Sequence, residues 1–357
     1  MLLRLEPRLS DPSAAEWAAR TALGLILALL LAALVIAFAG YDPLSALAAL
    51  GRGAFGSLRA LAATINKAVP IGLCAMGIAL AYRARLWNIG AEGQLYFGAF
   101  AATGVALALP ETAAPVLAVP AVLIAGMVAG AAWAALAALP RAYLGMNEIL
   151  STLMLTYVAI LWVGYLVTGP WADPLTFSFP YSEPIPAVAR LGQLAGGIHG
   201  GVLVLVAAAV LLLAVDRGLR WGYELRVAGD APRAAVYGGI SRAGTILTGL
   251  MVAGALAGLA GAIEVSASTG RLQAGLSPGY GFMGILVAWL AAGNPAGIAA
   301  ASILYAGLQN GGFALQVAGI PPAITVVLQA VVLLSTLAVV GLGHYRIRLV
   351  RQSGAMG

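Results

Sequence analysis

The chain has 357 residues, of which 62% are hydrophobic and only 9% are charged, and its mean hydropathy is +0.97. These proportions leave too little polar surface to cover a water-soluble protein of this length, so most of the chain must lie in lipid. The apolar runs far exceed the roughly 10 residues of a barrel strand, which predicts an all-α, polytopic transmembrane helical bundle.

Runs of about 20 apolar residues predict ten spans in one membrane domain, 21–342. These spans lie near residues 21–40, 61–82, 89–109, 115–138, 149–168, 199–215, 244–266, 281–293, 296–317 and 322–342. The first run resembles a cleavable signal peptide, but its length favours an uncleaved span. The eighth run is too short for a straight crossing and follows residues 277–281 (SPGYG), which predicts a broken or re-entrant segment.

The arginines predict which side of the membrane each connection faces, because basic residues are enriched in cytoplasmic connections. Fourteen arginines lie inside if the N-terminus is cytoplasmic: Arg4, Arg8, Arg20, Arg83, Arg85, Arg141, Arg217, Arg220, Arg226, Arg233, Arg242, Arg346, Arg348 and Arg351. Four lie outside: Arg52, Arg59, Arg190 and Arg271. Both termini, 1–20 and 343–357, are therefore expected in the cytoplasm. The formal net charge of +6 follows from this bias and does not indicate nucleic acid.

Two connections are longer than the others. The connection at about 169–198 is rich in proline and is expected outside, whereas the one at about 216–243 holds five arginines and is expected in the cytoplasm. A long basic connection among short ones is a candidate docking site for a soluble partner. The alternative is a solvated loop that only follows the positive-inside rule.

The sequence lacks the residues that several kinds of chemistry require. The single lysine, Lys67, has no glycine-rich loop before it, so the chain has no nucleotide-binding motif and is not expected to be an ATPase. With His199, His344 and Cys74 as the only histidines and cysteine, neither a metal site nor a histidine-based catalytic triad is expected. The chain is therefore predicted to bind no cofactor and to be no enzyme.

Polar residues at membrane depth are the candidate functional residues, because they are costly there unless they are paired or face a cavity. Asn88 and Tyr96 lie four residues before and after Glu92, which predicts one polar stripe along a helix. Helix packing, a helix cap, substrate contact and proton relay all remain open for this stripe, and packing is favoured. The candidate residues of a substrate pathway are Asn88, Glu92, Gln94, Tyr96, Asn147, Glu148 and Thr152.

Further polar and small residues carry weaker predictions. Ser268 lies one turn after Glu264, and Lys67 either reaches the outer interface or pairs with a carboxylate across the bundle. Gly254 and Gly258 have the spacing of a small-residue pair that packs helices together.

Three stretches carry a resemblance: residues 86–94 (LWNIGAEGQ), residues 145–154 (GMNEILSTLM), and residues 278–282 (PGYGF) running on to 294–298 (NPAGI). They resemble the permease family of bacterial ABC importers for branched-chain amino acids, simple sugars and nucleosides. The form NIGAEGQ is similar to the nucleoside and simple-sugar branch. The resemblance covers most of the chain from about 61 to 338.

The cytoplasmic connection carries a fourth resemblance. Residues 233–239 (RAAVYGG) resemble the Glu-Ala-Ala-x-x-x-Gly signature by which importer permeases dock into their ATPases, with Arg233 in place of the glutamate. The resemblance assigns coupling to Arg233, Ala234, Ala235, Tyr237 and Gly239. Small alanines would let a helix sit closely in a groove, and Gly239 would let that helix end.

The resemblance implies an importer in the bacterial cytoplasmic (inner) membrane that works by alternating access. Its expected partners are a cytosolic ATPase that holds ATP and Mg, a second permease chain, an extracytoplasmic lipoprotein that binds substrate, and membrane lipid. A heterodimer of permeases is favoured over a homodimer. A nucleoside or nucleobase is the favoured substrate, and simple sugars and branched-chain amino acids are alternatives. An ion-coupled secondary transporter that uses Glu92 or Glu264 is the alternative of another class.

Overall fold

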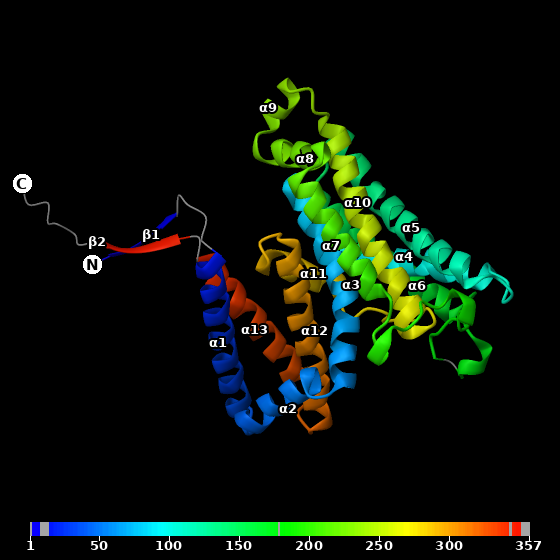
Figure 1. Cartoon of the computed structure of the whole chain (residues 1–357), viewed down its shortest axis with the longest axis horizontal. Helices are drawn as coiled ribbons and strands as arrows, with labels where there is room; N and C mark the ends of the chain where they lie inside the picture. Colours follow the sequence, from blue (N-terminus) through cyan, green and yellow to red (C-terminus); the bar gives the residue numbers. More distant parts are fainter. Residues whose placement is uncertain (1, 8–13, 178, 343–344, 351–357) are drawn as a thin grey trace, which may run out of the picture. The chain divides into compact units, whose positions relative to one another are not determined.

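The structure is a computed structural model that describes residues 2–7, 14–177, 179–342 and 345–350. Long helices dominate the described part (Figure 1). The elements are β1 (Leu2–Pro7), α1 (Ala14–Phe38), α2 (Pro43–Phe55), α3 (Leu58–Arg83), α4 (Ala91–Ala108), α5 (Pro115–Leu144), α6 (Glu148–Thr168), α7 (Gly201–Arg217), α8 (Arg220–Asp230), α9 (Pro232–Tyr237), α10 (Arg242–Ile263), the π-helix η4 (Glu264–Thr269), α11 (Tyr280–Leu290), α12 (Pro295–Val317), α13 (Pro322–Leu342) and β2 (Tyr345–Val350). The connection between α6 and α7 holds three short 3₁₀ helices, η1 (Pro174–Thr176), η2 (Ala187–Ala189) and η3 (Ala195–Gly197).

Each of the ten predicted apolar runs corresponds to a helix, namely α1, α3, α4, α5, α6, α7, α10 with η4, α11, α12 and α13. Within the described ranges, six helices are long and apolar enough to cross a membrane, and a seventh is added if α7 and α8 form one span bent by 68°. The multi-pass helical class is therefore confirmed. The count of ten stays a prediction, because α1, α4 and α11 are not among these helices, and α11 and the apolar part of α1 are shorter than a full crossing.

The two ends of the chain form a feature that the sequence did not predict. Strands β1 and β2 pair antiparallel, with Leu2 opposite Val350 and Pro7 opposite Tyr345. The described chain is thus helical apart from this two-stranded ribbon and short isolated bridges in the connections. A paired ribbon requires the N-terminal and C-terminal segments to lie together.

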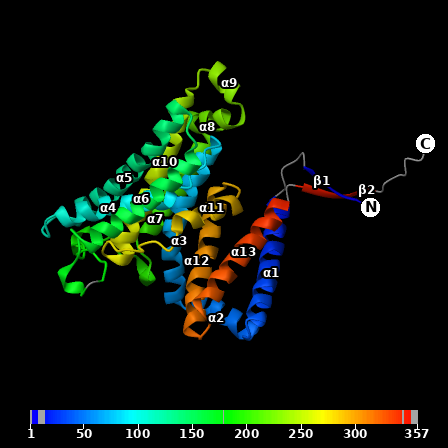
Figure 2. The ribbon, with the colours of Figure 1, turned by 180° about the vertical axis from the view of Figure 1, so that it is seen from behind.

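The chain divides into two compact units, one formed by 1–56 with 308–357 and the other by 57–307, so the division falls inside α12. In the first unit α1 packs along α13, and both views show the two helices side by side (Figures 1 and 2). A side chain at Gly24 would approach the Cα of Thr336 to 3.3 Å, so this glycine keeps the two helices close.

In the second unit, glycines let α4, α5 and α10 approach one another closely. A Cβ at Gly258 of α10 would overlap the carbonyl oxygen of Gly126 on α5, and one at Gly254 would overlap that of Gly130. One turn further along α10, a Cβ at Gly261 would overlap the carbonyl oxygen of Leu95 on α4. The predicted packing role of Gly254 and Gly258 is confirmed.

Helix α3 lies at the centre of the second unit. Every residue from Ala68 to Ala81 is buried, and α3 packs against α10, α11 and α7. A helix that is apolar all round is expected to be buried on all sides, and α3 follows that rule.

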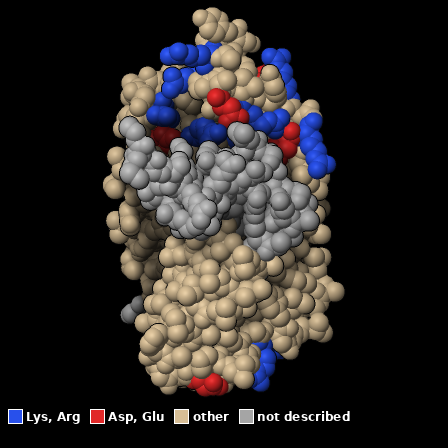
Figure 3. All heavy atoms as spheres, turned by 90° about the vertical axis from the view of Figure 1, so that its left-hand side faces the viewer, with Lys and Arg blue, Asp and Glu red and all other residues tan. Residues whose placement is uncertain are grey.

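The predicted cytoplasmic arginines of the second unit lie at one end of it. The turn after α3, the end of α5 and helices α8 and α9 bring them together, as the ion pairs below show. Figure 3 shows blue and red side chains gathered near the top of the displayed face. Arg190 lies in the connection between α6 and α7, and Arg271 lies in the segment after η4. Both therefore lie at the helix ends opposite to those that carry the predicted cytoplasmic arginines.

Candidate functional site

Glu92 holds the start of α11 from across the bundle. Its side chain lies in the first turn of α4, is 2% exposed, and accepts a hydrogen bond of 2.6 Å from the backbone N–H of Gly281. A carboxylate at a helix N-terminus is stabilised by unpaired backbone N–H groups and by the helix dipole. Gly281 has to be a glycine, because a Cβ there would overlap the backbone nitrogen of Glu92.

Tyr96 fixes the irregular residues before α11. Its hydroxyl accepts from the backbone N–H of Ser277 at 3.3 Å and lies 3.4 Å from the carbonyl oxygen of the same residue. Ser277 in turn holds the start of α11, since its Oγ accepts from the backbone N–H groups of the N-cap Gly279 and of Tyr280 at 3.1 and 2.8 Å. The eighth predicted span is thus a short helix with a non-helical entry, and its place as a broken or re-entrant segment stays a prediction.

Asn88 does not belong to the polar stripe that the sequence predicted. It lies in the turn before α4, which begins at Ala91 after the N-cap Gly90. Asn88 is therefore outside the helix and cannot share a helical stripe with Glu92. Its amide instead forms two hydrogen bonds with the amide of Gln94, of 2.8 and 2.9 Å, and both residues are buried. The stripe was therefore wrongly predicted at Asn88, whereas Glu92 and Tyr96 do lie one turn apart on α4. The alternative that Asn88 caps this helix does not hold, because the N-cap is Gly90.

Glu148 forms a second buried polar contact, at the start of α6. It is 5% exposed and lies 3.0 Å from Nε of Arg141 on α5, and the backbone N–H of Trp87 donates to it at 3.5 Å. Thr152, one turn later, is buried and donates to the carbonyl oxygen of Glu148 at 2.6 Å. Asn147 is exposed and caps α6 by accepting from Ile149. Contact of any of these residues with a substrate stays a prediction.

The predicted coupling segment forms two short helices at the arginine-rich end. On α9, Tyr237 is 94% and Val236 61% exposed, and Arg233 and Ala234 are exposed too. Ala235 differs from the other predicted coupling residues, because it is buried against its own chain at 3% exposure. It therefore seats α9 on the unit and is not available to a partner.

The end of α9 fits the expectation for a glycine at this position. Gly239 has a φ of +78° and follows the C-cap Gly238, whose N–H donates to the carbonyl oxygen of Ala234 at 2.9 Å. A left-handed residue just after a helix commonly ends it, and glycine adopts that conformation without strain.

Ion pairs hold α8 and the neighbouring helix ends together. Arg83 of α3 and Arg226 of α8 both pair with Asp216 of α7. Arg85, in the turn after α3, pairs with Asp230 at the end of α8 at 3.0 Å, and this hydrogen bond raises the pKa of Arg85. The segment 216–243 is therefore tied to the helices it follows and is not a solvated loop.

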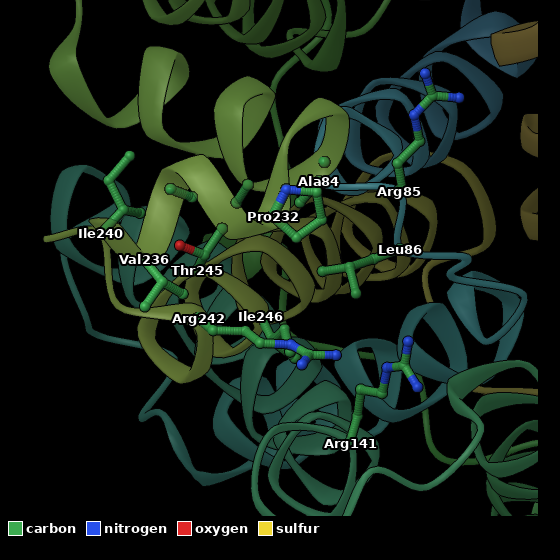
Figure 4. A pocket seen from close by; sticks show the side chains of 13 residues that line it. Ala84, Arg85, Leu86, Arg141, Pro232, Val236, Ile240, Arg242, Thr245 and Ile246 are labelled. Carbon is green, nitrogen blue, oxygen red and sulfur yellow. The ribbon is translucent and has the colours of Figure 1, made fainter. Parts of the chain in front are cut away.

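A cavity of about 160 Å³ lies beneath α9 (Figure 4). Its walls come from the turn after α3, the end of α5, helices α8 and α9 and the start of α10, and they include Arg141 and Arg242. The side chain of Arg85 extends away from it in Figure 4. Within the described ranges, no group of three His, Cys, Asp or Glu side chains is placed to hold a metal ion.

Residues 60–337 match the family described as branched-chain amino acid transport system / permease component. The chain belongs to this family. The resemblance predicted from residues 86–94, 145–154 and 278–298 is thereby confirmed, and its extent agrees with the predicted range of about 61 to 338.

The permease is also similar to named transporter subunits. It is 34% identical to the glucose ABC transporter permease protein TsgB13 of Haloferax volcanii, over 97% of this chain and 93% of that protein. It is 31% identical to the guanosine ABC transporter permease protein NupP of Bacillus subtilis, over 87% and 90%, and 29% identical to the nucleoside ABC transporter permease protein NupB of Lactococcus lactis, over 87% and 88%. No solved structure matches this chain.

Sequence reasoning missed two residues of the permease that position α11. Ser277 and Gly281 contact Tyr96 and Glu92 over 181 and 189 residues of chain. A signal was present, because the SPGYG stretch combines a serine, a proline and glycines, residue types that mark the start of a helix. This signal did not indicate which helix would contact the start of α11.

Proposed function

We propose that this permease is the membrane-spanning subunit of an ATP-binding-cassette importer and moves a nucleoside or a simple sugar into the cell by alternating access. The names of its relatives support this class, since guanosine and other nucleosides contain a hydroxylated sugar and glucose is one. Membership of a family of transport-system permease components favours this function over an ion-coupled secondary transporter.

The observation that carries the proposal is the exposed outer side of α9 at the arginine-rich end. Arg233, Ala234, Val236 and Tyr237 face outward, whereas Ala235 anchors the helix inward. A cytosolic ATPase, which would hold ATP and Mg, receives this side of α9 in a groove. The ion pairs of Asp216 and Asp230 would transmit its movement to α3 and α7, and the cavity beneath α9 leaves room for that movement.

In this proposal the contact between α4 and α11 belongs to the moving pathway. Asn88 and Gln94 satisfy each other, and Glu92 and Tyr96 hold the start of α11, so none of them is free to bind solute in this conformation. Opening of this contact would expose their polar groups to a passing solute. Glu148 and Thr152 would act in the same way at the cytoplasmic end.

The proposal includes the arrangement of the complete transporter. The chain crosses the bacterial cytoplasmic membrane ten times with both termini inside, in agreement with the pairing of β1 and β2 and with the segregation of arginines. A second, related permease completes the pathway as a heterodimer, and an extracytoplasmic lipoprotein delivers the solute to the side of the 169–198 connection. The domain extends over 21–342.

Co-purification with the ATPase tests this function. Ala234→Asp and Tyr237→Ala change exposed positions and are expected to abolish co-purification, because each alters the surface that the groove receives. Leu175→Asp, at an 81% exposed position of the 169–198 connection, serves as the matched control and retains the ATPase. The proposed docking is refuted if either α9 variant retains the ATPase as the control does.

A further inference from the structure

The cavity beneath α9 gathers positive charge without negative charge. Three arginines line it, namely Arg85 in the turn after α3, Arg141 near the end of α5 and Arg242 at the start of α10, and none of the described residues that line it is acidic. Figure 4 shows the side chain of Arg242 extending towards that of Arg141. A cavity of about 160 Å³ has room for several water molecules, so a group as large as a phosphate can enter between these two side chains.

Two of the three arginines are already paired within the chain. Arg85 pairs with Asp230 and extends away from the cavity, and Nε of Arg141 lies 3.0 Å from the carboxylate of Glu148. Arg242 differs, because no carboxylate among the described residues forms an ion pair with it. The described walls of the cavity therefore keep one unbalanced positive charge, which matches the single negative charge of a phosphodiester.

Hydrogen-bond donors remain available at the same place. Within the described part, Arg141 donates from Nη1 to the carbonyl oxygen of Met146 at 3.3 Å, which leaves Nη2 to donate elsewhere. Helix α10 begins at Arg242, so the positive end of its dipole lies at the cavity as well. Other walls are apolar, among them the buried Leu86 and Ile246. Apolar walls exclude water, which strengthens the attraction between an anion and the arginines.

The surface of α5 beside the cavity can accommodate a lipid chain. Tyr143 and Leu144, which follow Arg141, are 68% and 75% exposed, and only 33% of the most apolar stretch of α5 is buried inside the chain. An apolar helix face that its own chain leaves exposed lies against lipid or against another spanning helix. A basic pocket between spanning helices on the cytoplasmic side is a typical place for the headgroup of an anionic lipid.

We propose that the cavity between Arg141 and Arg242 binds a phosphate group with one negative charge, supplied by an anionic phospholipid of the membrane. Arg242 meets the phosphate with up to two parallel hydrogen bonds and Arg141 with one, while the acyl chains follow α5 past Leu144. The bound lipid joins α5, α9 and α10 at the arginine-rich end. The site needs neither the solute nor the ATPase, so it goes beyond the proposed function and does not depend on it.

Binding of radiolabelled phosphatidylglycerol to the purified full-length chain in a neutral detergent tests the site. The wild type is expected to bind phosphatidylglycerol more tightly than phosphatidylcholine, because the choline group cancels the charge of its phosphate. Arg242→Gln is expected to weaken the binding of phosphatidylglycerol about ten- to hundredfold, the loss expected for hydrogen bonds to a charged group, and Arg242→Glu to abolish it. Arg242 is exposed, so both variants are expected to fold, which an unchanged elution in size-exclusion chromatography checks.

The matched control is Arg59→Gln, which removes an exposed arginine from the first turn of α3, at the other end of that helix, and is expected to keep the wild-type affinity. Inorganic phosphate, added as a competitor, separates a lipid from a free anion. Displacement of phosphatidylglycerol by an equal concentration of inorganic phosphate would overturn the assignment to a lipid. Equal affinity of the wild type for the two lipids, wild-type affinity in Arg242→Gln, or an equal loss in Arg59→Gln would overturn the site itself.

Discussion

The close contact of α10 with α5 predicts a large effect for the smallest possible substitution, Gly258→Ala. The added methyl group would overlap the carbonyl oxygen of Gly126 and meet the Cα of Gly130 at 2.8 Å. Both obstacles are backbone atoms, so the helices must separate because no side chain can turn away. Overpacking of a core costs about 1–3 kcal/mol, and a backbone obstacle places this case at the upper end, about 3 kcal/mol. The helix propensity of alanine offsets about 1 kcal/mol, which leaves a net loss of about 2 kcal/mol.

The single cysteine supplies the assay for this prediction. Cys74 on α3 is fully buried, so a thiol-reactive fluorogenic dye labels it only when the second unit opens. Labelling of the detergent-solubilised protein during heating is expected to begin at a lower temperature in Gly258→Ala than in the wild type. Gly164→Ala on α6 is the matched control, since a Cβ there meets no atom within 4 Å, and it is expected to leave the transition unchanged or raise it. Equal transitions for the two variants would refute the close α5–α10 contact.

Three further predictions use the same Cys74 labelling. Glu92→Ala removes the acceptor of the 2.6 Å hydrogen bond at the start of α11, and we expect a loss of about 1.5–3 kcal/mol; an unchanged transition would contradict this anchor. Arg141→Met leaves the buried Glu148 without its cation at a cost of about 3 kcal/mol, and Arg141→Met with Glu148→Leu together is expected to regain stability, whereas additive losses would contradict the pairing. Burial lowers the pKa of His199, so its contribution to stability is complete above the ordinary pKa of about 6.5 and is lost as the pH falls through the lowered value; the transition temperature should drop as the pH falls below about 6.5, and less so in His199→Gln.

The positions of the helices could be predicted from the sequence because their cause is local. In a membrane every backbone polar group needs an internal partner, so each sufficiently long apolar run forms a helix. The run at 149–168 illustrates this, since α6 begins at Glu148 after the capping Asn147. The glycine spacing at 254 and 258 likewise predicted close packing, because it depends on one helix face.

The polar contacts could not be predicted because their partners are distant in the sequence. Spacing placed Asn88, Glu92 and Tyr96 on one stripe, but it could not show that Gly90 starts the helix after Asn88. It also could not show that Glu92 accepts a hydrogen bond from the backbone N–H of Gly281, which lies 189 residues away. The burial of Ala235 could not be predicted either, because a signature of small residues does not show which alanine faces the protein.

Cross-linking from α9 tests the central claim most directly. A cysteine introduced by Tyr237→Cys lies at a 94% exposed position, while the native Cys74 is buried and does not react. In membranes that contain the complete transporter, a short bifunctional thiol reagent is expected to join this cysteine to the cytosolic ATPase, with a yield that changes when ATP is added. Leu175→Cys on the 169–198 connection is expected to give no such product. A Tyr237→Cys protein that never cross-links to the ATPase, or a Leu175→Cys protein that does, would contradict the account.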